Sequence, residues 1–159
     1  MAGPKYQEIS MFNKTFLAAS VCLLALTAQA AGPSRTYVTP ENCKPGPCPP
    51  FSNGVLVGRT YYVAGHLGLD PATGQAATDV ETEVRLLMEE VKTTLKRGGL
   101  TMDDLVSVTV YCTDLSLYDQ FNAVYRSYFH GNFPARAFVG ASKLVRGARF
   151  EIQGVALKP

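Results

Sequence analysis

The apolar residues from position 54 onward follow two spacings, which predicts a chain that mixes strands and helices. Residues 54–58 and 60–64 are short β-rich runs with a tight gap between them, a pattern that predicts a hairpin. Residues 104–113 alternate apolar and polar positions and are rich in β-branched side chains, so they predict a strand. Residues 135–141 and 149–157 predict two final strands.

Two helices are predicted between these strands. The first begins at Thr78 and Glu81, which have capping-box spacing, and ends at Gly98 and Gly99. Its core-facing residues, at helical intervals, are Val84, Leu87, Met88, Val91 and Leu95. Its solvent-facing residues are predicted to be Glu83, Arg85, Glu89, Glu90 and Lys92. The second helix is predicted to begin at Ser116, and its aromatic, core-packing face comprises Tyr118, Phe121, Val124, Tyr125 and Tyr128.

The predicted element order is β-β-α-β-α-β-β. This order fits an α+β fold, a single sheet with two helices on one face. The pattern supplies no further helix to cover the second face of such a sheet. A sheet face of apolar and small residues that nothing covers favours self-association.

The N-terminal stretch predicts a secretory signal peptide over residues 1–30. Lys14 supplies the positive charge, residues 16–26 the apolar stretch, and residues 28–30 (Ala-Gln-Ala) the small-residue cleavage site. The alternative is an uncleaved membrane anchor, which is disfavoured because the apolar run is short for a bilayer. The mature protein is therefore expected to be periplasmic or secreted.

Three further boundaries complete the predicted organisation. Residues 1–10 are interpreted as an upstream extension, because the signal pattern begins at Met11. Residues 31–49 are predicted to form an irregular, proline-rich lead-in that lies on the surface or along one sheet edge. Residues 50–159 are predicted to form the folded domain.

Composition is that of an ordinary globular domain. The 159 residues favour a single domain, and 47% are hydrophobic while 18% are charged. The formal net charge is only +2, without a clustered basic face, which disfavours a nucleic-acid partner. No ligand spacing links His66 and His130 to each other or to the cysteines, so no metal site is predicted.

Two cysteines are predicted to form a disulfide after export. Cys43 and Cys48 are separated by Lys-Pro-Gly-Pro, whereas a redox Cys-x-x-Cys motif has two intervening residues. In an oxidising compartment this spacing favours a small structural loop over a redox site. Cys112 lies in a predicted strand and is expected to be a buried apolar residue.

Arg136 is the candidate site residue that the strand pattern singles out. Period-two alternation places it with Phe138 and Gly140 on one strand face, predicted to point away from the helices. The other face, predicted to pack under the helices, comprises Ala135, Ala137, Val139 and Ala141. An unpaired charge in a core strand is costly, so the guanidinium needs a partner. The residues leave two partners open: a carboxylate ligand held by the planar fork, or a structural salt bridge to Glu151 or another acid.

Several ordered motifs resemble the Rid (YjgF) family of imine deaminases. Residues 133–144 contain Phe-Pro-Ala-Arg, and residues 150–152 read Phe-Glu-Ile, which together resemble the family's C-terminal signature. Residues 50–52 (Pro-Phe-Ser), 63–71 (Val-Ala-Gly-His-Leu-Gly-Leu-Asp-Pro) and 122–125 (Asn-x-x-Tyr) resemble three further family motifs. The resemblance therefore extends over nearly the whole predicted domain.

The resemblance implies a chorismate-mutase-like fold and a homotrimer with three ligand clefts between subunits. It implies hydrolysis of 2-imino acids or their enamine tautomers to 2-oxo acids and ammonium, with no metal or organic cofactor. The catalytic residues it implies are Arg136, which binds the substrate carboxylate, and Glu151, which either assists the attacking water or only orients Arg136. The other substrate-binding residues it implies are Phe51, Ala64, Gly65, Asn122 and Phe138.

The chain departs from the family motifs at several positions, four of them in or beside the implied site. Phe51 replaces a Tyr, Ala64 a Ser, His66 a Gln, and Phe138 a Cys or small residue. The changes predict a more apolar cleft, unless the two phenylalanines only fill space at a subunit interface. Two other functions stay open: a non-enzymatic trimeric small-molecule-binding or chaperone-like protein, and RNA cleavage, which the near-neutral charge disfavours.

Overall fold

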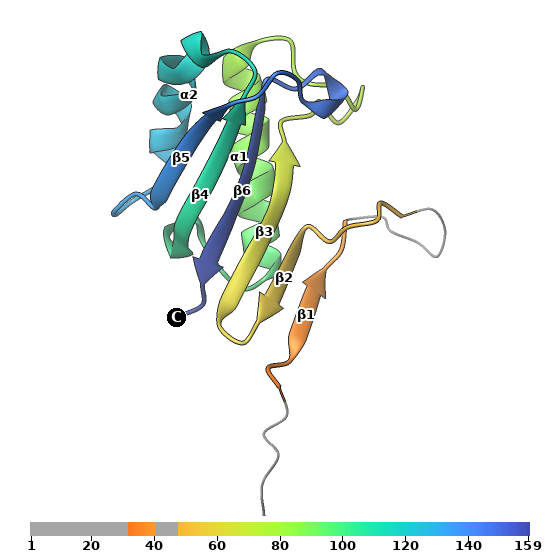
Figure 1. The fold of residues 1–159 in the computed structure, drawn as a ribbon, viewed down its shortest axis with the longest axis vertical. Helices are drawn as coiled ribbons and strands as arrows, with labels where there is room; N and C mark the ends of the chain where they lie inside the picture. The colour runs from red at the N-terminus through yellow and green to blue at the C-terminus, as the bar shows by residue number, and fades with distance from the viewer. Residues whose placement is uncertain (1–31, 41–47) are drawn as a thin grey trace, which may run out of the picture. The chain divides into compact units, whose positions relative to one another are not determined.

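Six strands form one mixed sheet in the computed structural model of the protein (Figure 1). The structure describes residues 32–40 and 48–159, so the predicted signal peptide and Cys43 lie outside the described residues. The strands are β1 (Arg35–Val38), β2 (Gly54–Val57), β3 (Thr60–Leu67), β4 (Leu105–Cys112), β5 (Ala135–Gly140) and β6 (Phe150–Leu157). They lie in the order β1-β2-β3-β6-β4-β5. The β4–β5 pair is parallel, and the other neighbouring pairs are antiparallel.

Two helices, α1 (Val80–Arg97) and α2 (Tyr118–Tyr125), cover one face of this sheet (Figure 1). Single 3-10 turns at Leu115–Leu117 and Arg126–Tyr128 extend α2 at its two ends. The predicted α+β class and the order β-β-α-β-α-β-β are therefore confirmed. The strand β1 is an addition to that order.

The lead-in is more regular than predicted. Arg35–Val38 pairs antiparallel with β2 and forms one edge of the sheet, so the prediction of an irregular segment is wrong for these residues. The expected position along a sheet edge is confirmed. Val38 explains the pairing, because this β-branched residue is buried against the core at the end of the strand.

The start of α1 also differs from the prediction. Asp79 caps the helix, and its carboxylate accepts a hydrogen bond of 2.8 Å from the Thr82 amide. The capping box predicted from Thr78 and Glu81 is wrong by one residue at the cap. The predicted glycine stop is confirmed, since Gly99 adopts a φ of +76°, which favours glycine after a helix.

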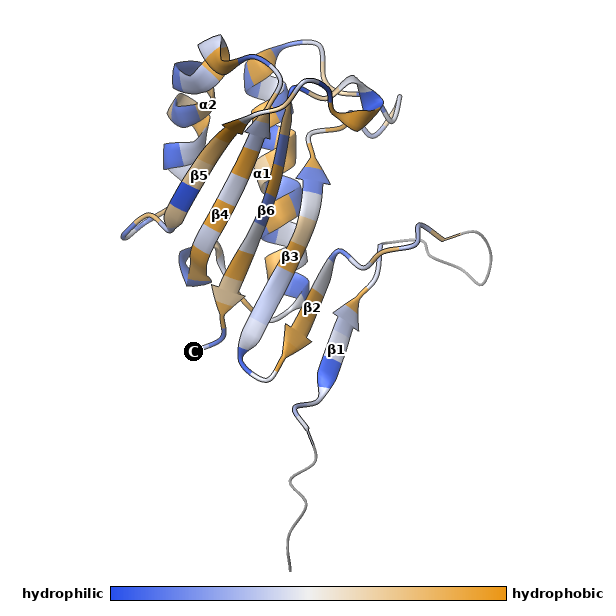
Figure 2. Ribbon diagram, in the orientation of Figure 1, coloured by the Kyte–Doolittle hydropathy of each residue, from blue (hydrophilic) through white to orange (hydrophobic). Residues whose placement is uncertain are grey.

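The core lies between the helices and the sheet. Its fully buried side chains include Tyr61, Leu87, Phe121 and Phe150. Figure 2 shows apolar and polar residues alternating along the central strands, so the second face of the sheet is more polar. We call this second face the open face, because α1 and α2 both lie on the other side.

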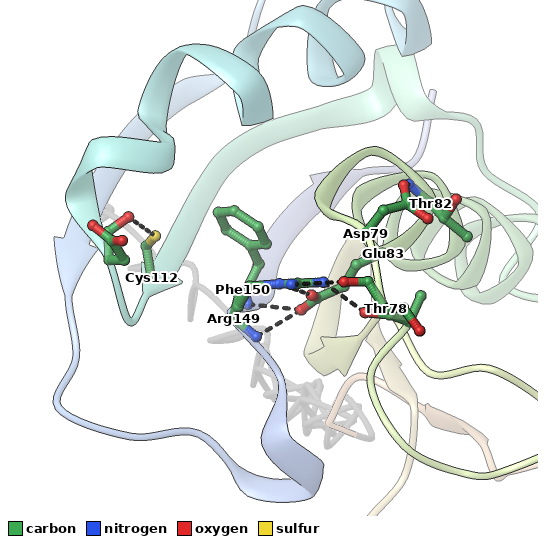
Figure 3. Close-up of polar contacts among 9 residues, drawn as sticks. Thr78, Asp79, Thr82, Glu83, Cys112, Arg149 and Phe150 are labelled. Carbon is green, nitrogen blue, oxygen red and sulfur yellow. Dashed lines mark hydrogen bonds and ion pairs between the residues drawn. The ribbon is translucent and has the colours of Figure 1, made fainter.

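One charged residue of α1 belongs to the core, contrary to the prediction. Glu83 is fully buried, whereas the sequence pattern placed it on the solvent face. Its carboxylate accepts hydrogen bonds from Arg149 Nε at 2.5 Å, the Arg149 amide at 2.6 Å and the Phe150 amide at 3.1 Å (Figure 3). Arg149 also donates to the carbonyl oxygens of Ala77 and Thr78. This buried ion pair joins the first turn of α1 to the start of β6.

Cys112 is fully buried at the end of β4, as predicted. Its thiol donates to the Asp114 carbonyl at 3.0 Å, and burial raises the pKa of the thiol. Because a reactive cysteine needs an accessible thiolate, these features favour a structural role for Cys112.

Candidate active site

Arg136 points toward the helices from β5, so the predicted orientation of this strand is wrong. Arg136 and Phe138 contact aromatic rings of α2. The alanines predicted to pack under the helices, Ala135 and Ala137, are exposed instead. The alternation was predicted correctly, but aromatic rings of α2 attract a guanidinium better than they attract methyl groups.

Four aromatic rings surround the Arg136 guanidinium. Its Cζ lies 4.7 Å from the centre of the Tyr125 ring, and between 5.6 and 5.9 Å from the rings of Phe138, Tyr118 and Phe121. We call these four residues the aromatic cage. Cation–π attraction and the restricted rings hold the guanidinium in place without neutralising its charge.

Arg136 pairs with no carboxylate among the described residues. Its Nη2 atom donates a long hydrogen bond of 3.4 Å to the Tyr118 hydroxyl, and its side chain also interacts with the Tyr125 hydroxyl. The salt bridge to Glu151 that the sequence left open does not form. A half-buried cation with free donors is therefore available to an anionic ligand.

The guanidinium opens on a pocket of about 280 Å³, which we call the arginine pocket. The pocket is lined by Asn122, Tyr125, Arg126, Phe133, Pro134 and Arg136. Asn122, which is only 8% exposed, contributes to the wall of this pocket from α2. The role of Asn122 in binding a ligand stays a prediction.

Glu151 lies in a different place. Its neighbours along β6, Phe150 and Ile152, are buried on the helix side, so the Glu151 side chain projects from the open face. Arg136 and Glu151 are also two strands apart, about 10 Å across the sheet. Val108 of β4 pairs with Arg136 of β5 on one side and with Gly154 of β6 on the other, so Arg136 is in register with Gly154 and not with Glu151. The two predicted catalytic residues therefore do not meet within one chain.

Gly65 and Ala64 form a bulge beside Glu151. The register of β3 and β6 shifts between Val63 and His66, so that both residues oppose a single β6 position. A Cβ atom on Gly65 would overlap the Glu151 carboxylate, so a larger residue here would have to displace the Glu151 side chain. The bulge thus places the Gly65 backbone against the Glu151 carboxylate, while the substrate-binding role of Gly65 and Ala64 stays a prediction.

Phe51 and His66 line a second pocket on this side, of about 400 Å³, together with Gly65. Phe51 is 56% exposed, so its ring is available to a ligand or to another subunit. His66 is buried, and its Nε2 atom has no hydrogen-bond partner among the described residues. Burial lowers the pKa of His66 to about 4, although a hydrogen bond with the Asn53 backbone opposes the shift.

His66 should make stability depend on pH. Between pH 6.5 and about 4 the unfolded chain binds a proton at His66 that the folded chain does not, so the free energy of unfolding falls as the pH falls through this window. The loss should approach about 3 kcal/mol and then level off below that range. Urea unfolding at pH 7 and pH 4.5 measures it. The His66→Gln variant should lose less stability between these two values, and equal losses in both proteins would contradict the expectation.

The structure therefore divides the predicted site residues into two groups. Arg136, Phe138 and Asn122 gather at β5 and α2, and the rest gather at β3, β6 and the segment before β2: Phe51, Ala64, Gly65 and Glu151. Sequence reasoning missed Arg126 and Phe133 in the arginine pocket. Each of them adjoins a motif found in the sequence: Arg126 directly follows Asn-x-x-Tyr, and Phe133 directly precedes Pro-Ala-Arg.

Neither a metal centre nor a membrane span emerges from the part of the chain that the structure describes. No three described His, Cys, Asp or Glu side chains cluster closely enough to hold a metal ion. No described helix combines the length and apolar character needed to cross a bilayer. Cys48 is disulfide-bonded, while its predicted pairing with Cys43 stays a prediction.

Comparisons with known proteins agree with this fold and these motifs. A family model described as Endoribonuclease L-PSP matches residues 42–158. Human 2-iminobutanoate/2-iminopropanoate deaminase is 36% identical over 115 residues, which cover 72% of this chain and 84% of the human protein. A RutC family protein from Pyrococcus abyssi is 35% identical over 115 residues, covering 72% of this chain and 91% of that protein.

Solved structures give the same result. The YjgF gene product from E. coli superposes with a TM-score of 0.70 at 29% identity, covering 78% of this chain and 99% of that chain. E. coli TdcF with bound serine superposes with a TM-score of 0.69 at 28% identity. The match covers 78% of this chain and 100% of the TdcF chain. On its motifs, its fold and these matches, the chain belongs to the Rid (YjgF) family.

Proposed function

We propose that this protein hydrolyses 2-imino acids, or their enamine tautomers, to 2-oxo acids and ammonium. The observation that carries the proposal is the half-buried Arg136 guanidinium, which faces the arginine pocket without a carboxylate partner among the described residues. Relatives named as 2-iminobutanoate/2-iminopropanoate deaminases support the reaction class, the human one at 36% identity.

Arg136 binds the substrate carboxylate in this proposal. Its planar fork donates two parallel N–H···O bonds to the carboxylate, which fixes the orientation of the adjacent imine carbon. The aromatic cage holds the guanidinium before the substrate arrives, so little conformational freedom is lost on binding. Asn122 supplies a further hydrogen-bonding group from the wall of the same pocket.

The reaction needs water and no oxidant. A water oxygen adds to the C2 carbon of the C=N bond, and its proton moves to the nitrogen to give a carbinolamine. The C–N bond then breaks as the C=O bond forms, and ammonia leaves and takes up a proton. Imines hydrolyse in water unaided, so the protein need supply only positioning and a route for the proton. Glu151 accepts the proton of the attacking water in this scheme and passes it on to the imine nitrogen.

A complete cleft requires more than one copy of the chain. Arg136 and Glu151 lie on opposite sides of the sheet, so one small substrate cannot touch both in one subunit. We therefore propose a homotrimer in which Arg136 of one subunit faces Glu151, Gly65 and Phe51 of the next. The open face supports this arrangement, because neither helix covers it and it exposes Tyr62 of β3 (52%) and Val139 of β5 (41%) among its polar residues. The disulfide at Cys48 supports the further proposal that the protein is exported to the periplasm or secreted.

The reaction is tested with imino acids made in situ. An amino-acid oxidase, with catalase to remove peroxide, generates 2-iminobutanoate from 2-aminobutanoate, and the appearance of 2-oxobutanoate is followed with and without the purified protein. The protein should accelerate oxo-acid formation well above the uncatalysed rate. If it binds 2-oxobutanoate but gives no acceleration, the protein is a non-enzymatic binder. Cleavage of single-stranded RNA without imine hydrolysis would also overturn the proposal.

A further inference from the structure

The arginine pocket holds a second guanidinium that the proposed reaction does not use. Arg126 follows the last residue of α2 and lines the same pocket as Arg136. Its Cζ lies 5.9 Å from the centre of the Phe133 ring. Like Arg136, it forms no ion pair with any acidic side chain in the described ranges.

A stacked aromatic pair separates the two guanidiniums. The rings of Tyr125 and Phe133 lie 6.3 Å apart with an interplanar angle of 24°. Arg136 packs on the Tyr125 ring and Arg126 packs on the Phe133 ring. Cation–π contacts therefore hold the two positive charges in separate places around one pocket.

The polar groups of this pocket favour an anionic ligand. None of its lining residues is acidic. Asn122, only 8% exposed, lines this pocket, and the buried Tyr125 hydroxyl has no partner among the described residues other than the Arg136 side chain beside it. Burial raises the pKa of Tyr125 to about 12, so its hydroxyl keeps its proton at neutral pH. Two cations and uncharged polar groups complement a ligand that carries two separate negative groups better than a ligand that carries one.

We infer that Arg126 selects substrates whose side chain carries a second carboxylate, that is, 2-imino dicarboxylates such as 2-iminoglutarate. The inference rests on the proposed function, since Arg136 takes the carboxylate next to the imine and Arg126 takes the one at the far end of the side chain. A neutral side chain leaves Arg126 hydrated and gains nothing from it. Because Arg126 is exposed, its contribution is modest, and we expect a preference of about fivefold to tenfold in kcat/KM.

The test compares a dianionic with a monoanionic imino acid. D-Aspartate oxidase makes 2-iminoglutarate from D-glutamate, and D-amino-acid oxidase makes 2-iminobutanoate from D-2-aminobutanoate. The ratio of the two kcat/KM values is measured for the wild type, for Arg126→Gln and for Lys96→Gln. The control removes an equal charge at Lys96, which does not line the pocket. Titration calorimetry with 2-oxoglutarate and 2-oxobutanoate gives a binding readout that needs no turnover.

Arg126→Gln should lower the ratio of kcat/KM for 2-iminoglutarate to kcat/KM for 2-iminobutanoate to near one. It should also weaken the binding of 2-oxoglutarate but not that of 2-oxobutanoate. Lys96→Gln should keep the wild-type ratio. The wild-type preference should also shrink at high ionic strength, because an exposed charge is screened by salt. Equal ratios in the wild type and Arg126→Gln would overturn the inference and leave the proposed hydrolysis intact. If no imine is hydrolysed faster than in buffer, the proposed function itself fails, and calorimetry still decides whether Arg126 selects dicarboxylates.

Discussion

Replacing Arg136 by alanine is expected to lower kcat/KM for 2-imino acid hydrolysis about a hundredfold. A charge-assisted pair of hydrogen bonds to a carboxylate contributes about 3 kcal/mol, which corresponds to a factor of this size. The alanine variant lacks both donors and also leaves an empty place within the aromatic cage. Steady-state kinetics with imino acids made in situ measures the effect.

Lysine and methionine at position 136 distinguish charge, geometry and packing. Arg136→Lys keeps the positive charge but loses the planar fork, so we expect a loss of at least about tenfold. Arg136→Met keeps an apolar stem against the rings of Tyr125 and Phe138, and it should fold well while remaining nearly inactive. The control is Arg85→Ala, which removes an exposed arginine that pairs with Glu81 on α1. Wild-type rates in both Arg136 variants would remove this residue from the mechanism.

Replacing Glu83 by alanine is expected to produce the largest loss of stability. The substitution leaves Arg149 without its carboxylate and leaves the Arg149 and Phe150 amides without an acceptor. Breaking one half of a buried, fully hydrogen-bonded ion pair costs about 3–5 kcal/mol. A loss of that size should lower Tm by about 10 °C or more in a domain of this length. Thermal unfolding followed by circular dichroism measures it.

Glu81 provides a matched control one half-turn away. It is exposed and pairs with Arg85 at 2.7 Å, so Glu81→Ala should cost less than about 1 kcal/mol. The double variant Glu83→Met/Arg149→Met should be more stable than Glu83→Ala alone, because it leaves no buried charge behind. A Tm for Glu83→Ala equal to that of Glu81→Ala would show that the buried pair contributes nothing.

The elements of the fold could be predicted because their side chains repeat regularly. The five buried apolar residues from Val84 to Leu95 and the alternation along β4 fix α1 and β4 from sequence alone. Glu83 was predicted to face solvent because it is charged, although its spacing in the helical pattern places it on the buried face. It precedes Leu87 by four residues and Val91 by eight, so it lies on the buried stripe, and its partner Arg149 lies far away in sequence.

The site was predictable in its residues but not in its arrangement. Alternation along β5 correctly grouped Arg136 with Phe138, but it could not say which face meets the helices, since that depends on the rings of α2. The aromatic stripe of α2 was interpreted only as core packing, whereas Tyr118 and Tyr125 also hold the guanidinium. The separation of Arg136 from Glu151 depends on the strand order β6-β4-β5, which no local pattern reveals.

Mixing two inactive variants tests most directly whether Arg136 and Glu151 of different subunits form one cleft. Arg136→Ala and Glu151→Gln are each expected to be nearly inactive alone. When the two chains are unfolded together and refolded as one population, a cleft is intact only if its arginine comes from one variant and its glutamate from the other. Random assembly should therefore restore about a quarter of the wild-type activity. Activity that stays at the level of the separate variants, while the subunits demonstrably exchange, would contradict the shared cleft.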